Sequence, residues 1–515
     1  MEIEVLRSPV EFLRHMLGAL PHERTLRDYE SWWETEGKHI SDATDRAGTP
    51  WLRMFDRGGR RVDEILFAPE YWRSLRQGYK AGVVWRAFED QSLSASALLD
   101  YITCFYDPGL TCPYVISLAT AVALDQHGSE ELKARFLPAL LRRDDTVWQG
   151  ATWMTEIKGG SDLGANVETV ARPDGDRWLL TGDKYFASNA GADLAVVAAR
   201  PEGAPAGVRG LALFLLPKRR ADGELNYTIR RLKGKVATRS VPTGEVELRG
   251  SEAWLLGSEE RGVNLILEVL NLSRATNALG SVAIAQRALA ESADFAGQRI
   301  AFGKPVLDHP LMRKQFDERI ETLQDGFALG WESILRLNEV WRQKPPYSDR
   351  YHLFRLVAHL AKYWTSDLAP QIARWAMEVH GALGVLAEFP VERWFREAMV
   401  LTIWEGTCHR QILDGLEVME RKGAHRLLFE ELREAADPVE LAAMRGRVET
   451  HLALPQAQRE AGAEEMFREL AVFTARAVRL AAVPVGGQTV GPPSKSLLAC
   501  SPQRGRGSSV SGLNP

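Results

Sequence analysis

Residues 154–162 read Met-Thr-Glu-Ile-Lys-Gly-Gly-Ser-Asp, a glycine-broken stretch at the change from helical to β-type sequence. Two adjacent glycines let the backbone approach a ligand closely, and successive backbone N–H groups can cradle an anion. Thr155 and Ser161 add hydroxyl donors. Taken alone, such a stretch is more commonly a plain loop that only turns the chain before a strand. It is therefore a candidate ligand loop whose assignment depends on the rest of the sequence.

Residues 403–407 read Ile-Trp-Glu-Gly-Thr and place one carboxylate, Glu405, beside a tryptophan and a glycine. Partial desolvation by the apolar neighbours would raise its pKa toward the range of a general base. The alternative is a glutamate at a helix N-terminus, where it stabilises the helix dipole. These residues alone support both interpretations equally.

Phe186 and Ser188 lie two residues apart in a β-type run and therefore point to the same face of a strand. An aromatic ring and a hydroxyl in this arrangement could stack on a flat ligand ring and hydrogen-bond its edge. The alternative is a core phenylalanine with an unrelated serine, which is the commoner case in isolation.

Two arginines are further candidates. Arg299 ends a helical run, followed by Phe302, and could reach a phosphate or simply compensate the helix dipole. Arg274 lies near the apolar face that contains Leu270 and Ala278, so it needs a partner or must extend to solvent. The alternative without a ligand is the commoner one for both arginines: dipole compensation for Arg299 and extension to solvent for Arg274.

The 515 residues are too many for one core, so roughly two to four domains are expected. With 45% hydrophobic and 26% charged residues, a net charge of −4 and four cysteines, the composition is that of an ordinary globular protein with no global attraction to nucleic acid. No CxxC pair or histidine cluster indicates a metal site or a disulfide framework. The sequence shows no signal peptide and no long apolar run, so we expect a cytoplasmic protein without a membrane span.

The pattern along the chain predicts five parts. Residues 1–150 are mostly helical, and residues 151–256 hold short β-type runs separated by turn residues, typical of an antiparallel barrel or sandwich. Residues 257–428 are helical again and include a core helix, because seven apolar residues between Met312 and Ile334 recur at steps of three and four. Residues 429–483 continue as charged helices, and residues 484–515 have the composition of a disordered tail.

The order and spacing of these segments together carry more information than any one of them. From about residue 70 to residue 425 the chain resembles the acyl-CoA dehydrogenase family, and most closely its alkylation adaptive-response, AidB-like branch. The resemblance rests on the loop at residues 154–162, the Phe-x-Ser strand in place of the commoner Trp-x-Thr, the Arg-Leu-Lys-Gly-Lys stretch that begins at Arg231, and Ile-Trp-Glu-Gly.

The resemblance implies a mainly α fold with a central β-barrel: an N-terminal helical domain, a β-barrel domain and a C-terminal four-helix bundle, assembled as a homotetramer. It implies FAD between barrel and bundle and Glu405 as the catalytic base. Carried over by position, the cofactor-binding residues are Thr152, Met154, Thr155, Gly160, Ser161, Phe186, Ser188, Arg299, Phe302, Glu378, Gly381, Gly406, Thr407 and His409. Ser161, Ser188 and Arg274 would face the substrate.

Within that set, Phe186 would cover the isoalloxazine, whereas Arg299 and Phe302 would reach the FAD of a neighbouring subunit. The chain departs from the family pattern at Glu378, where many members carry glutamine, because an acid near the pyrophosphate is electrostatically unfavourable. His409 stands where family members commonly carry an amide side chain after the base. The sequence after Val483 does not look like the branch's helical C-terminus, which suggests a truncated C-terminal module.

The implied activity is α,β-dehydrogenation of a short or branched acyl-CoA, with electron-transfer flavoprotein or oxygen as the acceptor. Glu405 would take the α-proton while the β-hydride leaves to the flavin. A second hypothesis is a DNA-associated protein of the alkylation response, although residues 421–483 carry equal numbers of basic and acidic side chains. A third keeps the flavin but uses oxygen or a nitroalkane; glutamate rather than aspartate at position 405 favours acyl-CoA chemistry.

Overall fold

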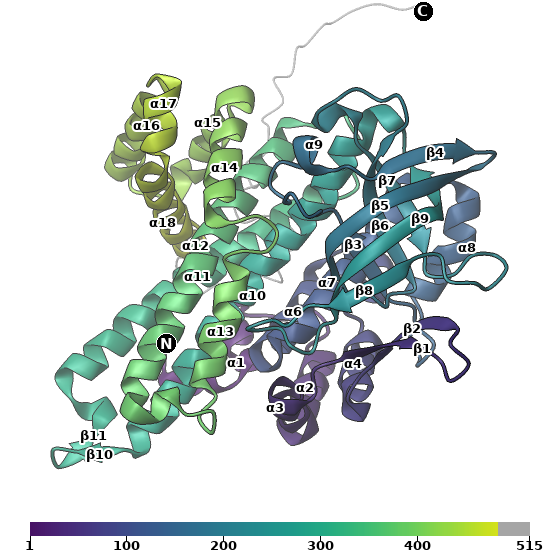
Figure 1. Cartoon of the computed structure of the whole chain (residues 1–515). Helices are drawn as coiled ribbons and strands as arrows, with labels where there is room; N and C mark the ends of the chain where they lie inside the picture. The colour runs from purple at the N-terminus through teal and green to yellow at the C-terminus, as the bar shows by residue number, and fades with distance from the viewer. Residues whose placement is uncertain (483–515) are drawn as a thin grey trace, which may run out of the picture.

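The N-terminal part is a set of helices packed around two of them, α6 and α7 (Figure 1). The structure, a computed structural model, describes residues 1–482. Helix α6 is buried around its whole circumference, because every residue from Ala95 to Tyr106 is buried. The helices of this part are α1 (Pro9–Leu17), α2 (Glu23–Trp32), α3 (Lys38–Ala47), α4 (Pro69–Ala81), α5 (Trp85–Glu89), α6 (Ser94–Tyr106), α7 (Pro108–His127) and α8 (Glu130–Leu140).

A β-hairpin interrupts these helices, which the sequence did not predict. It consists of β1 (Trp51–Phe55) and β2 (Arg61–Leu66), paired antiparallel. The buried Asp63 carboxylate accepts hydrogen bonds from Arg61 Nε (3.0 Å) and from the backbone N–H of Ile229 (2.9 Å), so the hairpin is tied to the central sheet. The strands are short and largely exposed, and therefore lack the apolar alternation that identifies a strand in a sequence.

Within residues 1–482, one helix is long and apolar enough to cross a membrane by length and composition. This is α7, which contains an 18-residue stretch with a mean hydropathy of 1.2. Of that stretch, 83% is buried inside the protein, as expected for a core helix. The expected cytoplasmic location stays a prediction.

The central part is a β sheet of mixed direction. The strands are β3 (Gly150–Trp153), β4 (Val170–Asp174), β5 (Arg177–Ser188), β6 (Leu194–Pro201), β7 (Ala212–Pro217), β8 (Thr228–Leu232) and β9 (Thr243–Leu256). The hydrogen-bonded ladders run β6–β4–β5–β9–β7 and return from β7 to β6, while β3 pairs with β6 and β8 with β9. Five of these strands overlap the β-type runs of the sequence, and the short β3 and β8 were not predicted.

The C-terminal part is a bundle in which α12 packs against α10, α11, α13 and α14. Its helices are α10 (Gly262–Gln298), α11 (Pro310–Val340), α12 (Asp349–His380), α13 (Val391–Leu401) and α14 (Cys408–Lys422), with a small hairpin of β10 (Ile300–Ala301) and β11 (Lys304–Pro305) after α10. The predicted core face of α11 is confirmed, because Phe316, Leu323 and Ile334 are fully buried.

The helices beyond the bundle are α15 (Ala424–Glu431), α16 (Pro438–Leu452), α17 (Gln456–Ala461) and α18 (Ala463–Ala482). Helix α18 packs on α11, α12 and α14 through buried Phe467 and Leu470. These helices share one apolar core with the outer faces of the bundle. The predicted disordered tail, residues 484–515, lies outside the described residues.

Candidate functional site

The loop at residues 154–162 connects β3 to the short helix α9 (Leu163–Asn166) and needs both of its glycines. Gly159 has φ +128°, a conformation that other residues rarely adopt, and its N–H donates to the Glu156 carbonyl at 3.0 Å. A Cβ on Gly160 would overlap the Thr155 hydroxyl. Ser161 is exposed at the loop surface. The loop therefore packs the Thr155 hydroxyl against Gly160 and exposes the hydroxyl of Ser161.

A buried ion pair, not found from the sequence, fastens this loop to β5. Lys184 Nζ lies 2.7 Å from Glu156 Oε1, and both side chains are almost fully buried. The Glu156 carboxylate also accepts from Thr169 Oγ1 at 2.6 Å and from the backbone N–H of Glu168 at 2.7 Å. These interactions, above all the charge of Lys184, hold the pKa of Glu156 below its usual value despite burial.

Strand β5 presents Phe186 to the outside of the sheet rather than to the core. The Phe186 side chain is 53% exposed, and Lys233 Nζ lies 4.9 Å from the centre of its ring. Ser188 is half-buried, and its hydroxyl lies 3.3 Å from Thr243 Oγ1. The core-phenylalanine alternative is therefore wrong, and an aromatic surface is available for a flat ring.

The segment that carries Glu405 joins α13 to α14 and has an unusual backbone. Glu405 has φ +59° and Gly406 φ +98°, both in the left-handed region. Buried side chains hold the carbonyls: Arg274 Nε donates to Glu405 O at 3.1 Å, and Gln411 Nε2 donates to Glu405 O at 3.1 Å and Gly406 O at 2.9 Å. Lys362 Nζ donates to Gly406 O at 2.8 Å. The backbone of the candidate base is thus fixed from behind.

The Glu405 carboxylate itself is in the state expected of a general base. Burial raises its pKa to about 7, while the charges of Arg274 and Lys362 oppose this rise. The Thr407 hydroxyl accepts from Arg410 N at 3.4 Å and caps α14, so Glu405 lies before the cap. Glu405 therefore does not act as the helix cap, and its side chain lines a cavity instead.

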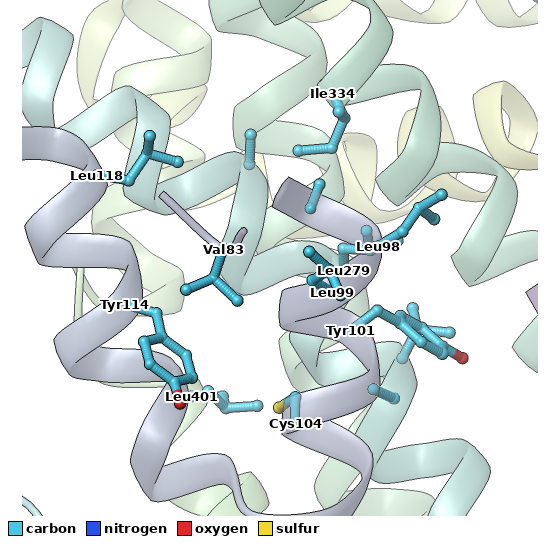
Figure 2. Close-up of a cluster of buried hydrophobic side chains, with 14 of the residues drawn as sticks. Val83, Leu98, Leu99, Tyr101, Cys104, Tyr114, Leu118, Leu279, Ile334 and Leu401 are labelled. Atoms are coloured by element: carbon cyan, nitrogen blue, oxygen red, sulfur yellow. The ribbon is translucent and has the colours of Figure 1, made fainter. Parts of the chain in front are cut away.

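That cavity is narrow and lies between α6, α7, α10 and the end of α13. Its lining includes Glu405 and Trp404, together with Cys112 of α7, Leu401 of α13 and Cys104 of α6. Figure 2 shows Leu401 and Cys104 beside each other at one end of the apolar cluster between these helices. The cavity has a mainly apolar lining and includes the candidate base in its wall.

Arg274 is buried rather than extended to solvent. Besides Glu405, its guanidinium contacts Asn271 Oδ1 at 2.9 Å and Asp414 Oδ2 at 3.2 Å. It lies behind the Glu405 loop and not among the residues that line the cavity. Contact of Arg274 with a substrate stays a prediction, whereas its role in holding the loop is shown by its hydrogen bonds.

The structure does not bring the remaining predicted residues to this cavity. Arg299 and Phe302 lie at the β10–β11 hairpin, at the lower left of Figure 1, away from the central sheet, and Phe302 is 97% exposed. Glu378 pairs with Arg374 at 2.6 Å near the exposed end of α12, just before Gly381.

The other predicted cofactor residues lie close to the two loops. Thr152 is half-buried on β3, and Met154 is buried where the loop begins. His409 is exposed in the first turn of α14. Within residues 1–482, no group of histidine, cysteine or acidic side chains has the arrangement of a metal site.

Three protein-family models match successive parts of the chain. The N-terminal domain of the adaptive response protein AidB matches residues 12–145. The middle domain of acyl-CoA dehydrogenases matches residues 151–251, and their C-terminal domain matches residues 260–419.

Individual proteins agree with these matches. AidB of Escherichia coli (strain K12) is 31% identical over 74% of this chain and 71% of its own length. Acyl-CoA dehydrogenase family member 11 of Caenorhabditis elegans is 29% identical over 81% of this chain and 70% of its own length. The crystal structure of C. elegans ACDH-11 in complex with C11-CoA superposes with a TM-score of 0.80, at 25% identity over 92% of this chain and 86% of that one.

Proposed function

Because the chain belongs to the acyl-CoA dehydrogenase family and to its AidB-like branch, and is an oxidoreductase of that type, we propose that it binds FAD and dehydrogenates a short or branched acyl-CoA. The family consists of flavoproteins that usually carry FAD. Beyond family membership, we therefore assign a cofactor, a substrate class and the residues that act on the substrate.

One observation carries the proposal: Glu405 combines a fixed backbone with a carboxylate that lines the cavity and has a pKa raised to about 7. A general base is most effective when its pKa lies near the working pH. Within residues 1–482 no side chain donates a hydrogen bond to this carboxylate, so it is available to a substrate.

The described residues fit a flavin. The exposed ring of Phe186 gives a surface for stacking, and the missing side chain of Gly160 lets the Thr155 hydroxyl lie against the loop backbone. Thr155, Ser161 and Ser188 supply hydroxyl groups for polar edges. A flavin bound there supplies a two-electron acceptor for the hydride from the β-carbon.

The chain's own residues then perform the proton step. Glu405 takes the proton from the α-carbon of the thioester, and the C–H electron pair becomes the new Cα=Cβ bond as the β-hydride leaves. The apolar walls of the cavity, including Leu401 and Trp404, exclude water from the reacting carbons. General-base assistance of this kind is typically worth about 10²–10⁴-fold in rate. The C11-CoA complex of the C. elegans relative supports an acyl-CoA as the ligand.

Replacement of Glu405 by glutamine tests the proposal. We expect FAD-loaded Glu405→Gln to keep its yellow flavin but to lose anaerobic bleaching by acyl-CoAs that bleach the wild type. Glu397→Gln is the matched control, because Glu397 is another buried carboxyl with a pKa raised to about 7. Its two oxygens share the backbone N–H of Thr238, and it does not line the cavity. Unchanged bleaching in Glu405→Gln would remove Glu405 from the base role.

We also propose that the exposed β10–β11 hairpin meets a second copy of the chain in a homotetramer and reaches its FAD. Ile300, Phe302 and Leu311 place large exposed apolar side chains close together in the sequence there. Phe302→Ser is expected to lower both the oligomer mass in solution and FAD retention. A tetramer of unchanged mass that retains all its FAD would refute this assignment.

Association with DNA is a second candidate function, favoured by an open depression of about 1600 Å³ over α14 to α17. Its basic residues are Arg421, Lys422, Arg426, Arg445 and Arg459. Several of them pair with acids, for example Arg421 with Glu417 at 3.0 Å, which weakens the field. Duplex binding that falls steeply with salt would support this function. Absence of binding at low salt would eliminate it.

A further inference from the structure

The cavity at Glu405 does not end at Cys104. A second, narrow cavity lies further along α6, and the two have Asp100, Val115 and Thr276 as common lining residues. The second cavity reaches Ile334 and Leu337 of α11. Figure 2 shows Val83 and Tyr114, which line it, between the two purple helices. The two spaces are neighbours, and Asp100 stands at their junction.

Asp100 is an unusual residue for the wall of an apolar pocket. Its side chain belongs to the face of α6 that also carries Ser96 and Cys104, one turn before and one turn after. Asp100 is 6% exposed, and in the described part of the chain its Oδ1 has no hydrogen-bond partner. Burial alone raises the pKa of this carboxyl well above its usual value, so it is a neutral acid with a proton to donate.

Two further polar groups in the walls of these two cavities are unused in the same way. Ser96 Oγ in the second cavity and Asn277 Nδ2 in the first are buried without a hydrogen-bond partner among residues 1–482. In contrast, the hydroxyls of Thr111 and Thr276 donate to backbone carbonyls at 2.9 and 3.0 Å. Buried polar groups in native proteins are nearly always satisfied, so three unsatisfied ones in the walls of two neighbouring cavities indicate a ligand group that completes them.

We propose that the acyl group of the substrate carries a neutral hydrogen-bonding substituent, a hydroxyl, oxo or amide group, that lies at the Asp100 junction when the thioester lies at Glu405. This inference rests on the proposed dehydrogenase function and specifies its substrate class. Asp100 is the specificity-determining residue, with Ser96 and Asn277 as the neighbouring donors. The remaining walls, such as Val115 and Leu118, contact the carbon chain.

A neutral group fits better than a cationic one. A cation would require Asp100 to ionise in a place where burial disfavours its charge, and the desolvation of both ions would oppose binding. No basic side chain lines either cavity. A neutral acid, by contrast, can donate one hydrogen bond to an oxygen of the ligand at little cost in solvation.

The test compares matched thioesters: hexanoyl-CoA with 6-hydroxyhexanoyl-CoA and 6-aminohexanoyl-CoA, and octanoyl-CoA with 8-hydroxyoctanoyl-CoA. Dissociation constants are measured by calorimetry on the FAD-loaded protein with 3-thia analogues, which cannot be dehydrogenated at C3. For at least one chain length, the hydroxylated chain is expected to bind the wild type about 3- to 10-fold more tightly than the plain chain. The ammonium chain is expected to bind more weakly than both.

Asp100→Leu is expected to abolish this preference, and Asp100→Asn to keep part of it because the amide can still donate. Thr111→Val is the matched control, since this hydroxyl lines the same cavity but is already bonded to the backbone, and it should leave the preference unchanged. Equal binding of plain and hydroxylated chains at both lengths, or a preference that survives Asp100→Leu, overturns the inference alone. Failure of every thioester to bind overturns the proposed function as well.

Discussion

Replacing Glu156 by glutamine should destabilise the protein at the loop of residues 154–162, and the buried contacts of Glu156 set the size of the loss. The Glu156 carboxylate receives four hydrogen bonds, from Lys184 Nζ, Thr169 Oγ1 and the backbone N–H groups of Glu168 and Thr169, at 2.6 to 3.2 Å. Glutamine keeps one acceptor oxygen but directs an N–H₂ group at donors. The Lys184 ammonium, completely buried, would keep only carbonyl partners such as Ala198 O at 2.7 Å.

Breaking a buried pair by removing one partner typically costs about 3–5 kcal/mol, because an uncompensated charge stays inside the protein. We therefore expect Glu156→Gln to lose about that much free energy of unfolding in urea titrations. Glu168→Gln is the internal control, because Glu168 pairs with Lys158 at 2.5 Å on the exposed side of the same loop. An exposed pair of this kind contributes about 0–1 kcal/mol. FAD affinity, measured by equilibrium dialysis, should fall for Glu156→Gln and not for the control.

The pH dependence gives an independent check. The pKa of Glu156 is lowered in the folded state from its ordinary value of 4.5, so its stabilisation is present above that value and is lost as the pH falls through the lowered pKa. The stability difference between wild type and Glu156→Gln should accordingly shrink below about pH 4. A loss no larger than that of Glu168→Gln would refute the reasoning. The reasoning would also be refuted if the double variant lost the exact sum of the free energies of unfolding lost by Glu156→Gln and Lys184→Met.

Three further predictions follow from the site. The rate of anaerobic flavin reduction should rise about tenfold between pH 6 and pH 8 in stopped-flow experiments, because Glu405 must be ionised and its pKa is raised to about 7; a flat profile would contradict this. Gly160→Ala should weaken FAD binding about fivefold or more in dialysis, because the new methyl group displaces the Thr155 hydroxyl, whereas unchanged affinity would place the flavin elsewhere. Asp100→Leu should raise the free energy of unfolding by about 1–3 kcal/mol, because it removes a buried carboxyl without a hydrogen-bond partner. The gain should be largest at high pH, since the raised pKa of Asp100 makes the wild-type carboxyl more destabilising as the pH rises. A destabilised variant would contradict the absence of a hydrogen-bond partner for Asp100.

The sequence predicted the features that depend on local pattern and missed those that depend on distant partners. The apolar steps of three and four from Phe316 to Ile334 identify a helix face because they are set by helix geometry within one element. The contact of Arg274 with the Glu405 carbonyl joins residues 131 positions apart, and neither residue carries a local sign of the other. The Lys184–Glu156 pair is hidden for the same reason, since a lysine on a strand and a glutamate in a loop usually lie in solvent.

The backbone of Glu405 shows why those distant partners matter for its proposed role as the base. A non-glycine residue at φ +59° costs of order 1–3 kcal/mol and persists only when its surroundings fix it. Arg274, Lys362 and Gln411 do so by donating to the carbonyls of Glu405 and Gly406. Arg274 and Lys362 donate these hydrogen bonds to carbonyls, so they act on the Glu405 carboxylate through their charge without forming an ion pair with it. The base therefore keeps a pKa near 7 and a free lone pair, whereas a direct salt bridge would have positioned it equally well and made it too weak to accept a proton.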